Sequence, residues 1–174
     1  MKNPGELKGL GGWLILICFI ILLTPPTIIF DVVPTYIEIF AEGTWQNIIN
    51  VDSLDYSPLL ATVIIIEIIY NFLMVLVSAI LLYLFIAKNS IFPWVFIVWF
   101  GSSLIFLPLD EWLIYIIYPK DPMFDPEILE GYFRELVGAA VWIPYMLKSK
   151  RVKATFVETF PKNSVFYKIF NNDE

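Results

Sequence analysis

The sequence predicts an all-α polytopic membrane protein, folded as a bundle of four transmembrane helices with both termini in the cytoplasm. Two features of the composition indicate this class. Of 174 residues, 59% are hydrophobic and only 16% are charged, whereas ordinary soluble domains carry about 25% charged residues. The mean hydropathy is +0.75. The third observation is a series of apolar runs long enough to cross a hydrocarbon core of about 30 Å.

The first predicted helix covers about residues 12–37. Its apolar run from Trp13 to Leu23 is followed by Thr24-Pro25-Pro26. Eleven residues make only about 16 Å of helix, so the helix has to continue past the prolines to cross a membrane. Because two consecutive prolines remove two backbone donors, we expect a kink near the middle of this crossing.

The second and third predicted helices cover residues 58–87 and 91–118. The second run is broken only by Glu67 and Asn71. At about 45 Å it exceeds the thickness of the hydrocarbon core, so it should tilt or protrude.

The fourth predicted helix covers residues 126–147. Asp125 is suited to cap it, and Pro126 occupies the first helical position, where its missing donor has no cost.

Between the first two crossings, Trp45, Ile48 and Ile49 fall on one helical face, which predicts a short interfacial helix on the outer side. Residues 1–160 are thus expected to form one membrane domain.

Basic residues predict the orientation of the bundle. Four crossings place both termini on one side, and that side holds nine of the 11 Lys and Arg residues; Lys120 and Arg134 are the other two. Since short cytoplasmic segments carry the excess of positive charge, both termini should lie in the cytoplasm.

A basic tail, residues 148–174, follows the fourth helix. Its basic residues are Lys148, Lys150, Arg151 and Lys153, and Val152, Phe156 and Phe160 recur every fourth position. One interpretation is an amphipathic tail lying on the anionic lipid of the inner leaflet. The other is a plain topology signal, and the pattern fits both equally.

Three charged residues on three predicted helices lie at similar depth. Glu67, Asp110 and Arg134 each fall about 12–13 Å inside the outer end of their helices, and Asn71 is one turn from Glu67. A charge near the centre of a membrane helix costs roughly 2.5–3.5 kcal/mol, so such residues usually pair or mark function. We therefore expect Arg134 to be buried and bonded to Glu67, Asp110 or both.

Three interpretations of these charges remain open. The first is a buried ion cluster that specifies the fold. The second is a local pair between Glu130 and Arg134, one turn apart on one helix, in the outer headgroups. The third is a functional site for an ion, a proton or a substrate.

The two ends of the membrane domain resemble a known family. The run G-L-G-G-W-L-I-L occupies residues 9–16, and W-I-P-Y-x-L-x-S-K-R-V-K-x-T-F occupies residues 142–156. Both are similar to the bacterial inner-membrane family called domain of unknown function 2569, which includes YdgK-like proteins. The resemblance covers most of the chain, and it implies four membrane helices with cytoplasmic termini. It implies no particular activity.

The residues favour a non-enzymatic role. The chain has no His and one Cys, Cys18, which removes the usual zinc ligands and nucleophile pairs, and we expect neither metal nor cofactor. Net charge −6 argues against a nucleic-acid partner. We expect a helper or interaction partner of another membrane complex. The alternative is a small transporter or channel that uses Glu67, Asp110 and Arg134 and forms homo-oligomers.

Overall fold

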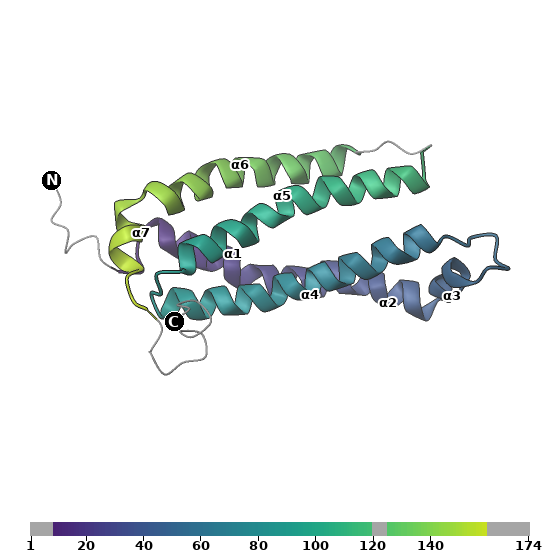
Figure 1. The fold of residues 1–174 in the computed structure, drawn as a ribbon, viewed down its shortest axis with the longest axis horizontal. Coiled ribbons are helices and arrows are strands. Elements are labelled where there is room, and N and C mark those ends of the chain that lie inside the picture. The colour runs from purple at the N-terminus through teal and green to yellow at the C-terminus, as the bar shows by residue number, and fades with distance from the viewer. Residues whose placement is uncertain (1–8, 120–124, 160–174) are drawn as a thin grey trace, which may run out of the picture.

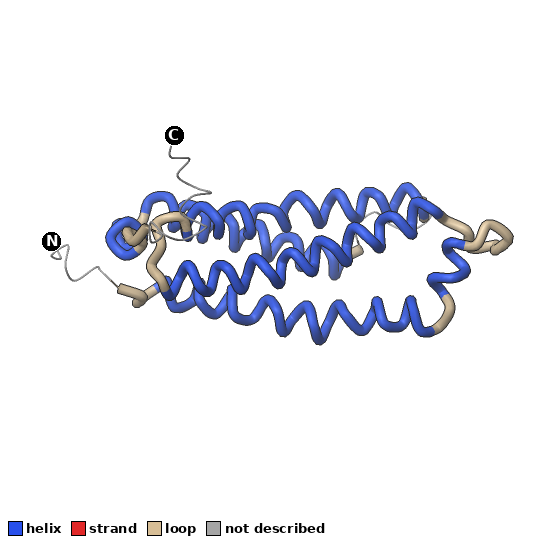
Figure 2. Tube along the Cα trace, turned by 60° about the horizontal axis from the view of Figure 1, so that its bottom comes forward, coloured by secondary structure: helices blue, strands red, loops and turns tan. Residues whose placement is uncertain are grey.

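The computed structural model describes residues 9–119 and 125–159. Within these residues all regular elements are helices, and strand pairing is limited to a single bridge between Asn89 and Glu158. The long helices lie side by side along one axis (Figures 1 and 2). The all-α class predicted from the sequence is therefore confirmed.

The first long rod is built from three consecutive segments: α1 (Trp13–Thr27), the π-helical η2 (Ile28–Val32) and α2 (Val33–Ala41). Together they form a continuous helical stretch of 29 residues. Pro25 and Pro26 lie inside α1, and the wider π turn follows directly after them. The prolines thus do not end the helix. The helical chain continues through the π turn of η2 into α2.

The other long helices begin at local sequence signals. These helices are α4 (Pro58–Ile86), α5 (Phe92–Ile117) and α6 (Pro126–Lys148), and each has a proline in its first turn. Two of them, α4 and α6, also have a side-chain cap. The Ser57 hydroxyl accepts from the Leu60 amide at 3.4 Å, and the Asp125 carboxylate accepts from the Ile128 amide at 2.8 Å. Such side chains satisfy amides that have no partner within the helix.

Three of these rods are long and apolar enough to cross a membrane, counted over the described residues: Trp13–Ala41, Pro58–Ile86 and Phe92–Ile117. The composition and the length of these helices are therefore those of a membrane protein. Helix α6, with 23 residues, is about 34 Å long. It is not among the three, because Glu127, Glu130, Arg134 and Glu135 all belong to it.

The short α3 (Thr44–Ile49) follows α2 at the end of the molecule opposite to α7. A helix was expected here, but its apolar residue Ile48 packs inward against Ala61 and Ile64 of α4 and is only 4% exposed. Trp45 packs against Phe40, with ring centroids 5.0 Å apart. Protein contacts thus hold α3 in place. We call this the α3 end of the bundle.

The helices pack in the order α1, α4, α5, α6, each against the next. Most of the buried core lies in the opposite half of the bundle, the α7 end, where the short α7 (Lys150–Thr155) closes the helices. This core draws side chains from five helices and from Phe156, which follows α7: Leu14, Ile17, Ile21, Leu81, Leu84, Phe85, Phe92, Phe96, Trp99, Met146, Val152 and Phe156.

One interpretation of the basic tail expected Val152 and Phe156 to face lipid, and that expectation is wrong. Val152 is 1% exposed and Phe156 is 5% exposed. Phe156 stacks on Phe92 with ring centroids 4.4 Å apart. The spacing that suggested a lipid-facing stripe instead buries these side chains in the protein, because the turn at Ser149 folds α7 back over the bundle. Phe160 lies outside the described residues.

The surface along the rods is apolar. Phe30, Phe72, Val98 and Ile105 are each between 67% and 75% exposed. In water such a surface would be an aggregation hazard, whereas in a bilayer it faces lipid.

Candidate functional site

A polar group joins three helices in the half of the bundle nearer the α3 end. It comprises Tyr36 of α2, Glu67 and Asn71 of α4, and Asp110 of α5, and we call it the Glu67 group. The Tyr36 hydroxyl donates to Glu67 Oε2 at 3.4 Å and accepts from Asn71 Nδ2 at 2.9 Å. Asn71 also donates to the Glu67 backbone carbonyl at 3.0 Å.

The Asp110 carboxyl of α5 lies beside the Glu67 carboxyl of α4. All four side chains are half-buried. Glu67, Asn71 and Asp110 are thus brought together as the sequence suggested, with Tyr36 as an additional member.

Arg134 does not join this group, so the predicted ion cluster of Arg134 with Glu67 and Asp110 is wrong. Its Nη2 lies 2.9 Å from Glu130 Oε1, one turn away on the same helix. The two side chains are 77% and 74% exposed. This is the local pair that the sequence left as an alternative, and it is the one ion pair found over residues 9–119 and 125–159.

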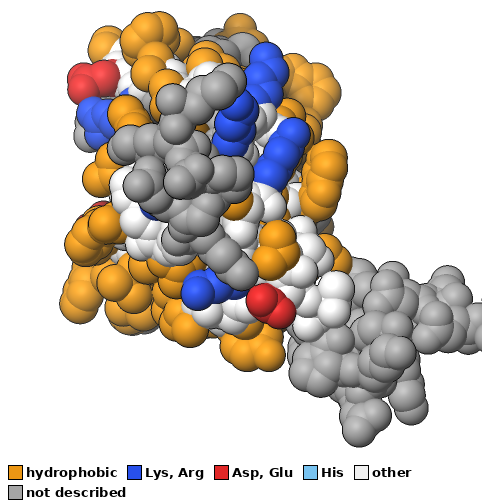
Figure 3. All heavy atoms as spheres, turned by 90° about the vertical axis from the view of Figure 1, so that its left-hand side faces the viewer, with side chains coloured by type: hydrophobic (Ala, Val, Ile, Leu, Met, Phe, Trp, Pro, Cys, Tyr) orange, Lys and Arg blue, Asp and Glu red, His pale blue; other side chains and the backbone are white. Residues whose placement is uncertain are grey.

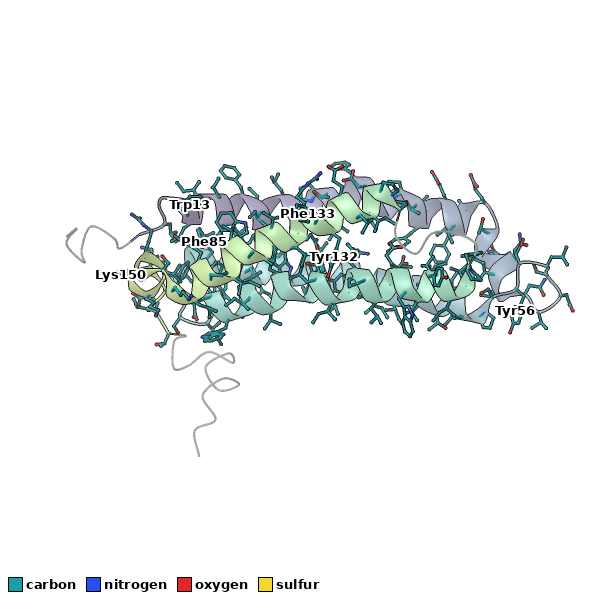
Figure 4. All side chains as sticks on the ribbon, turned by 90° about the horizontal axis from the view of Figure 1, so that it is seen from above. Trp13, Tyr56, Phe85, Tyr132, Phe133 and Lys150 are labelled. Atoms are coloured by element: carbon teal, nitrogen blue, oxygen red, sulfur yellow. The ribbon has the colours of Figure 1, made fainter. Side chains whose placement is uncertain are left out.

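The rotation of α6 explains this position of Arg134. The face turned toward α5 carries Tyr132, whose hydroxyl donates to the Leu104 carbonyl at 3.2 Å (Figure 4). It also carries Gly138, where an added Cβ would meet Phe100 Cζ at 3.1 Å. A helix that packs through these residues turns Arg134 outward.

Glu135, one residue further on, points the other way, into the protein. Its carboxyl lies beside Ser103 on α5. Its second oxygen, Oε2, is buried and has no hydrogen-bond partner among the described residues. A buried polar atom without a partner is costly, and such atoms often mark functional sites.

Glu135 lies on the wall of a cleft of about 780 Å³ between α1 and α6. The two helices touch at the α7 end, where the Trp13 and Trp142 rings are 5.8 Å apart, edge to face. Beyond this contact the cleft continues along the helices toward Thr27 and Ile28. Its polar lining consists of Thr24, Thr27, Ser103, Arg134 and Glu135.

Most of these polar groups present acceptors to the cleft. The Thr24 and Thr27 hydroxyls donate to the Ile20 and Leu23 carbonyls, each at 3.0 Å. With their protons used in the helix, their remaining capacity is to accept. Together with Glu135, they suit an apolar occupant that carries a hydrogen-bond donor.

The sequence reasoning did not identify Glu135 or Tyr36. The signal for Glu135 is its spacing, because Tyr132, Glu135, Gly138 and Ala139 follow the i, i+3, i+4 pattern of one helix face. Tyr36 adjoins polar positions of the first helix, but a phenol hydroxyl gives no pattern of its own. The spacing alone does not tell which face of α6 packs against α5, so Glu135 could be assigned to the protein interior only once the rotation of the helix was known. The same holds for Tyr36 on α2.

Over the described residues, no group of three or more His, Cys, Asp and Glu side chains has the arrangement of a metal site. The expectation that the chain uses no metal or cofactor remains a prediction.

The two sequence motifs at the ends of the membrane domain meet at the α7 end. The Gly9 amide donates to Thr155 Oγ1 at 3.1 Å, and this hydroxyl donates back to the Gly9 carbonyl at 3.2 Å. Thr155 is fully buried. We call this junction, formed by Gly9, Gly11, Gly12, Arg151 and Thr155, the clasp.

Arg151 completes the clasp. Its guanidinium lies over the glycine turn, so close that a Cβ added to Gly11 would be 3.1 Å from Nη1. Gly12 has φ +63°, a backbone conformation that favours glycine. The second and third glycines of the first motif, Gly11 and Gly12, therefore make room for the arginine of the second.

The remaining predicted basic residues surround the clasp. Lys148, Lys150 and Lys153 are exposed, while Arg151 is half-buried. Figure 3 looks onto this end and shows Lys and Arg side chains gathered among apolar ones. The residues expected at the inner membrane surface thus lie at one end of the bundle, and their contact with lipid stays a prediction.

A comparison with protein families shows which family the chain belongs to. The family model described as "Protein of unknown function (DUF2569)" matches residues 7–157, which includes both motifs of the clasp. The chain belongs to the DUF2569 family. The resemblance noted from the two motifs is confirmed, and the clasp gives these DUF2569 motifs a structural role. The chain matches no curated protein and no solved structure.

Proposed function

We propose that the chain is a non-enzymatic protein of the bacterial inner membrane that acts as a helper or interaction partner of another membrane complex. In this proposal α6 is the fourth crossing, both termini lie in the cytoplasm, and α3 lies at the outer surface. The α7 end then faces the cytoplasm, where Lys148, Lys150 and Lys153 meet anionic lipid.

The observation that carries the proposal is the cleft between α1 and α6. It contains a buried carboxyl oxygen of Glu135 that has no partner among the described residues. Lipid tails offer no donor, so lipid alone leaves this oxygen unsatisfied. A transmembrane helix with a donor side chain, entering from the bilayer, supplies both the apolar surface and the missing hydrogen bond.

The transporter alternative has less support. It relied on three charges at one depth, and Arg134 stands apart from Glu67 and Asp110. The remaining members of the Glu67 group bond to one another, which is also how a structural polar group is satisfied. The observations therefore favour the helper role.

Photocrosslinking from Leu23 tests the proposal. Leu23 lines the cleft and is 57% exposed. A photoreactive residue placed there in cells should give one discrete adduct whose mass is not that of two copies of this chain. The same residue at Ile105, which is 71% exposed on α5, should give no such adduct.

Glu135 variants sharpen this experiment. Glu135→Leu removes the acceptor, and losing a hydrogen bond to a charged group should lower the adduct yield about tenfold. Glu135→Gln keeps an acceptor oxygen and should retain part of the yield. An adduct that is equally strong from Leu23 and Ile105, or unaffected by Glu135→Leu, would exclude the cleft as the docking site.

A further inference from the structure

The outward face of α6 is a second surface, and it shares one edge with the cleft. It comprises Glu130, Phe133, Arg134, Val137, Ala140 and Val141, and we call it the α6 face. All six residues are exposed, Phe133 at 67%. Arg134, Val137 and Val141 also border the cleft.

The position of its charges makes this face unusual. Along the helix axis Arg134 is about 12 Å from Pro126 and about 21 Å from Lys148, so it lies within the hydrocarbon core if α6 crosses the membrane. This step rests on the fourth crossing proposed above. The pair of Arg134 with Glu130 neutralises the net charge but leaves both side chains exposed to lipid. Protein or water has to cover them.

The pattern of the α6 face is complementary to itself. Two copies of the chain enter the membrane in the same orientation, so a twofold axis along the membrane normal sets two α6 helices parallel, with equal residues at equal depth. Each Arg134 then lies within one turn of the Glu130 of the other copy. Because a guanidinium can bond two carboxylates, four charges satisfy one another across the axis.

The apolar part of the face suits such pairing. Val137, Ala140 and Val141 are small or medium-sized, and they follow the charged pair along the helix at the spacing of a left-handed helix pair. We infer that the chain forms a twofold dimer through the α6 face, in which Glu130 and Arg134 of the two copies make one four-membered ion cluster. The occupant of this face is thus a second copy of the chain.

Cysteine crosslinking tests the location of the dimer. Cys18 is the one cysteine in the sequence, so Cys18→Ser gives a clean background. Phe133→Cys in lipid nanodiscs should crosslink to a species of twice the chain mass of 20.2 kDa. Leu109→Cys, at similar depth on the lipid-facing side of α5 and 46% exposed, is the matched control and should not crosslink. Equal crosslinking at both positions, or a Phe133→Cys adduct of another mass, overturns the inference.

Charge reversal tests the ion cluster. Glu130→Arg or Arg134→Glu alone sets like charges against one another in the dimer and should raise its dissociation constant about tenfold or more, measured by native mass spectrometry. The double variant Glu130→Arg/Arg134→Glu restores complementarity and should restore the dimer. It also shows that reversed charges at these positions permit folding. Single variants that dimerise like the native chain, or a double variant that stays monomeric, contradict the cluster.

Failure of the dimer and failure of the proposed function give different results. The dimer predicts homodimer adducts from Phe133, whereas the helper role predicts adducts of another mass from Leu23. Homodimer adducts from both positions support the dimer and contradict the helper role. If Phe133 gives no adduct and the Leu23 adduct of another mass persists, the dimer is contradicted and the helper role is supported.

Discussion

At the scale of single residues, Thr155 connects the two ends of the membrane domain. Its hydroxyl both accepts from and donates to Gly9, 146 positions away in the chain. The side chain is fully buried, so water is not available to replace either bond. The clasp therefore depends on one hydroxyl group.

Substitution of Thr155 by Val tests this dependence. Val has nearly the same shape but leaves the amide and carbonyl of Gly9 without their partner, which should lower the free energy of unfolding by about 1–3 kcal/mol. Unfolding in detergent micelles, followed by circular dichroism, measures the change.

Two variants serve as controls for Thr155→Val. Thr155→Ser keeps the hydroxyl and should lose less. Thr62→Val removes an exposed hydroxyl that bonds only to the Pro58 carbonyl of its own helix, at 2.8 Å, and should have almost no effect. If Thr155→Val is as stable as Thr62→Val, the clasp does not stabilise the fold.

Residue depth was predictable from the sequence, but the direction of each side chain was not. Counting 1.5 Å per residue placed Glu67 and Asp110 at the same level, and the structure brings them together. The same count placed Arg134 at that level, yet Arg134 points away. Depth follows from the axial rise alone, whereas direction depends on which face of α6 packs against α5.

At the scale of helices, the contact between α5 and α6 is set by Gly138. Phe100 lies against this glycine and is itself held by Phe96 and Trp99, with ring centroids 5.7 and 6.3 Å away. A methyl group at position 138 therefore requires the Phe100 ring or the helix to shift by a few tenths of an ångström.

Gly138→Ala should lower the free energy of unfolding by about 1–3 kcal/mol, the usual cost of overpacking. Gly131, on the same helix, has nothing within 4 Å of an added Cβ. Gly131→Ala should therefore raise stability by about 0.5–1 kcal/mol through helix propensity. Thermal unfolding in the same detergent compares the two. Equal effects of both substitutions would show that α6 does not pack closely on α5 at this point.

The bounds of α4, α5 and α6 were well predicted, but the end of the first helix, which continues to Ala41, and the role of α7 were not. Helices α4, α5 and α6 begin and end within one residue of the predicted positions, since Ser57, Asp125 and the first-turn prolines are local signals. An amphipathic segment such as α7 carries no local signal that tells a lipid surface from a protein core. Val152 and Phe156 pack into the core at the α7 end, where the neighbouring Arg151 lies over the glycine turn at the start of α1.

At the scale of the whole molecule, the bundle has two different halves. The α7 end is closed by the clasp and holds most of the buried core, whereas the Glu67 group lies nearer the α3 end and the cleft lies near the middle of the bundle. Composition alone predicted a membrane protein, and the basic residues predicted its orientation. The cleft was not predictable, because it depends on α1 and α6 being held apart by their separate contacts with α4 and α5.

Reporter fusions after Glu174, Asp55 and Asn89 test most directly whether α6 is a fourth crossing that returns the chain to the cytoplasm. Four crossings predict that a fluorescent protein fused after Glu174 is bright and that alkaline phosphatase there is inactive. Fusions after Asp55 should show the opposite pattern, and fusions after Asn89 should match Glu174. Active phosphatase after Glu174, with the other two positions as predicted, would leave three crossings and contradict both the helper and the dimer arrangement of α6.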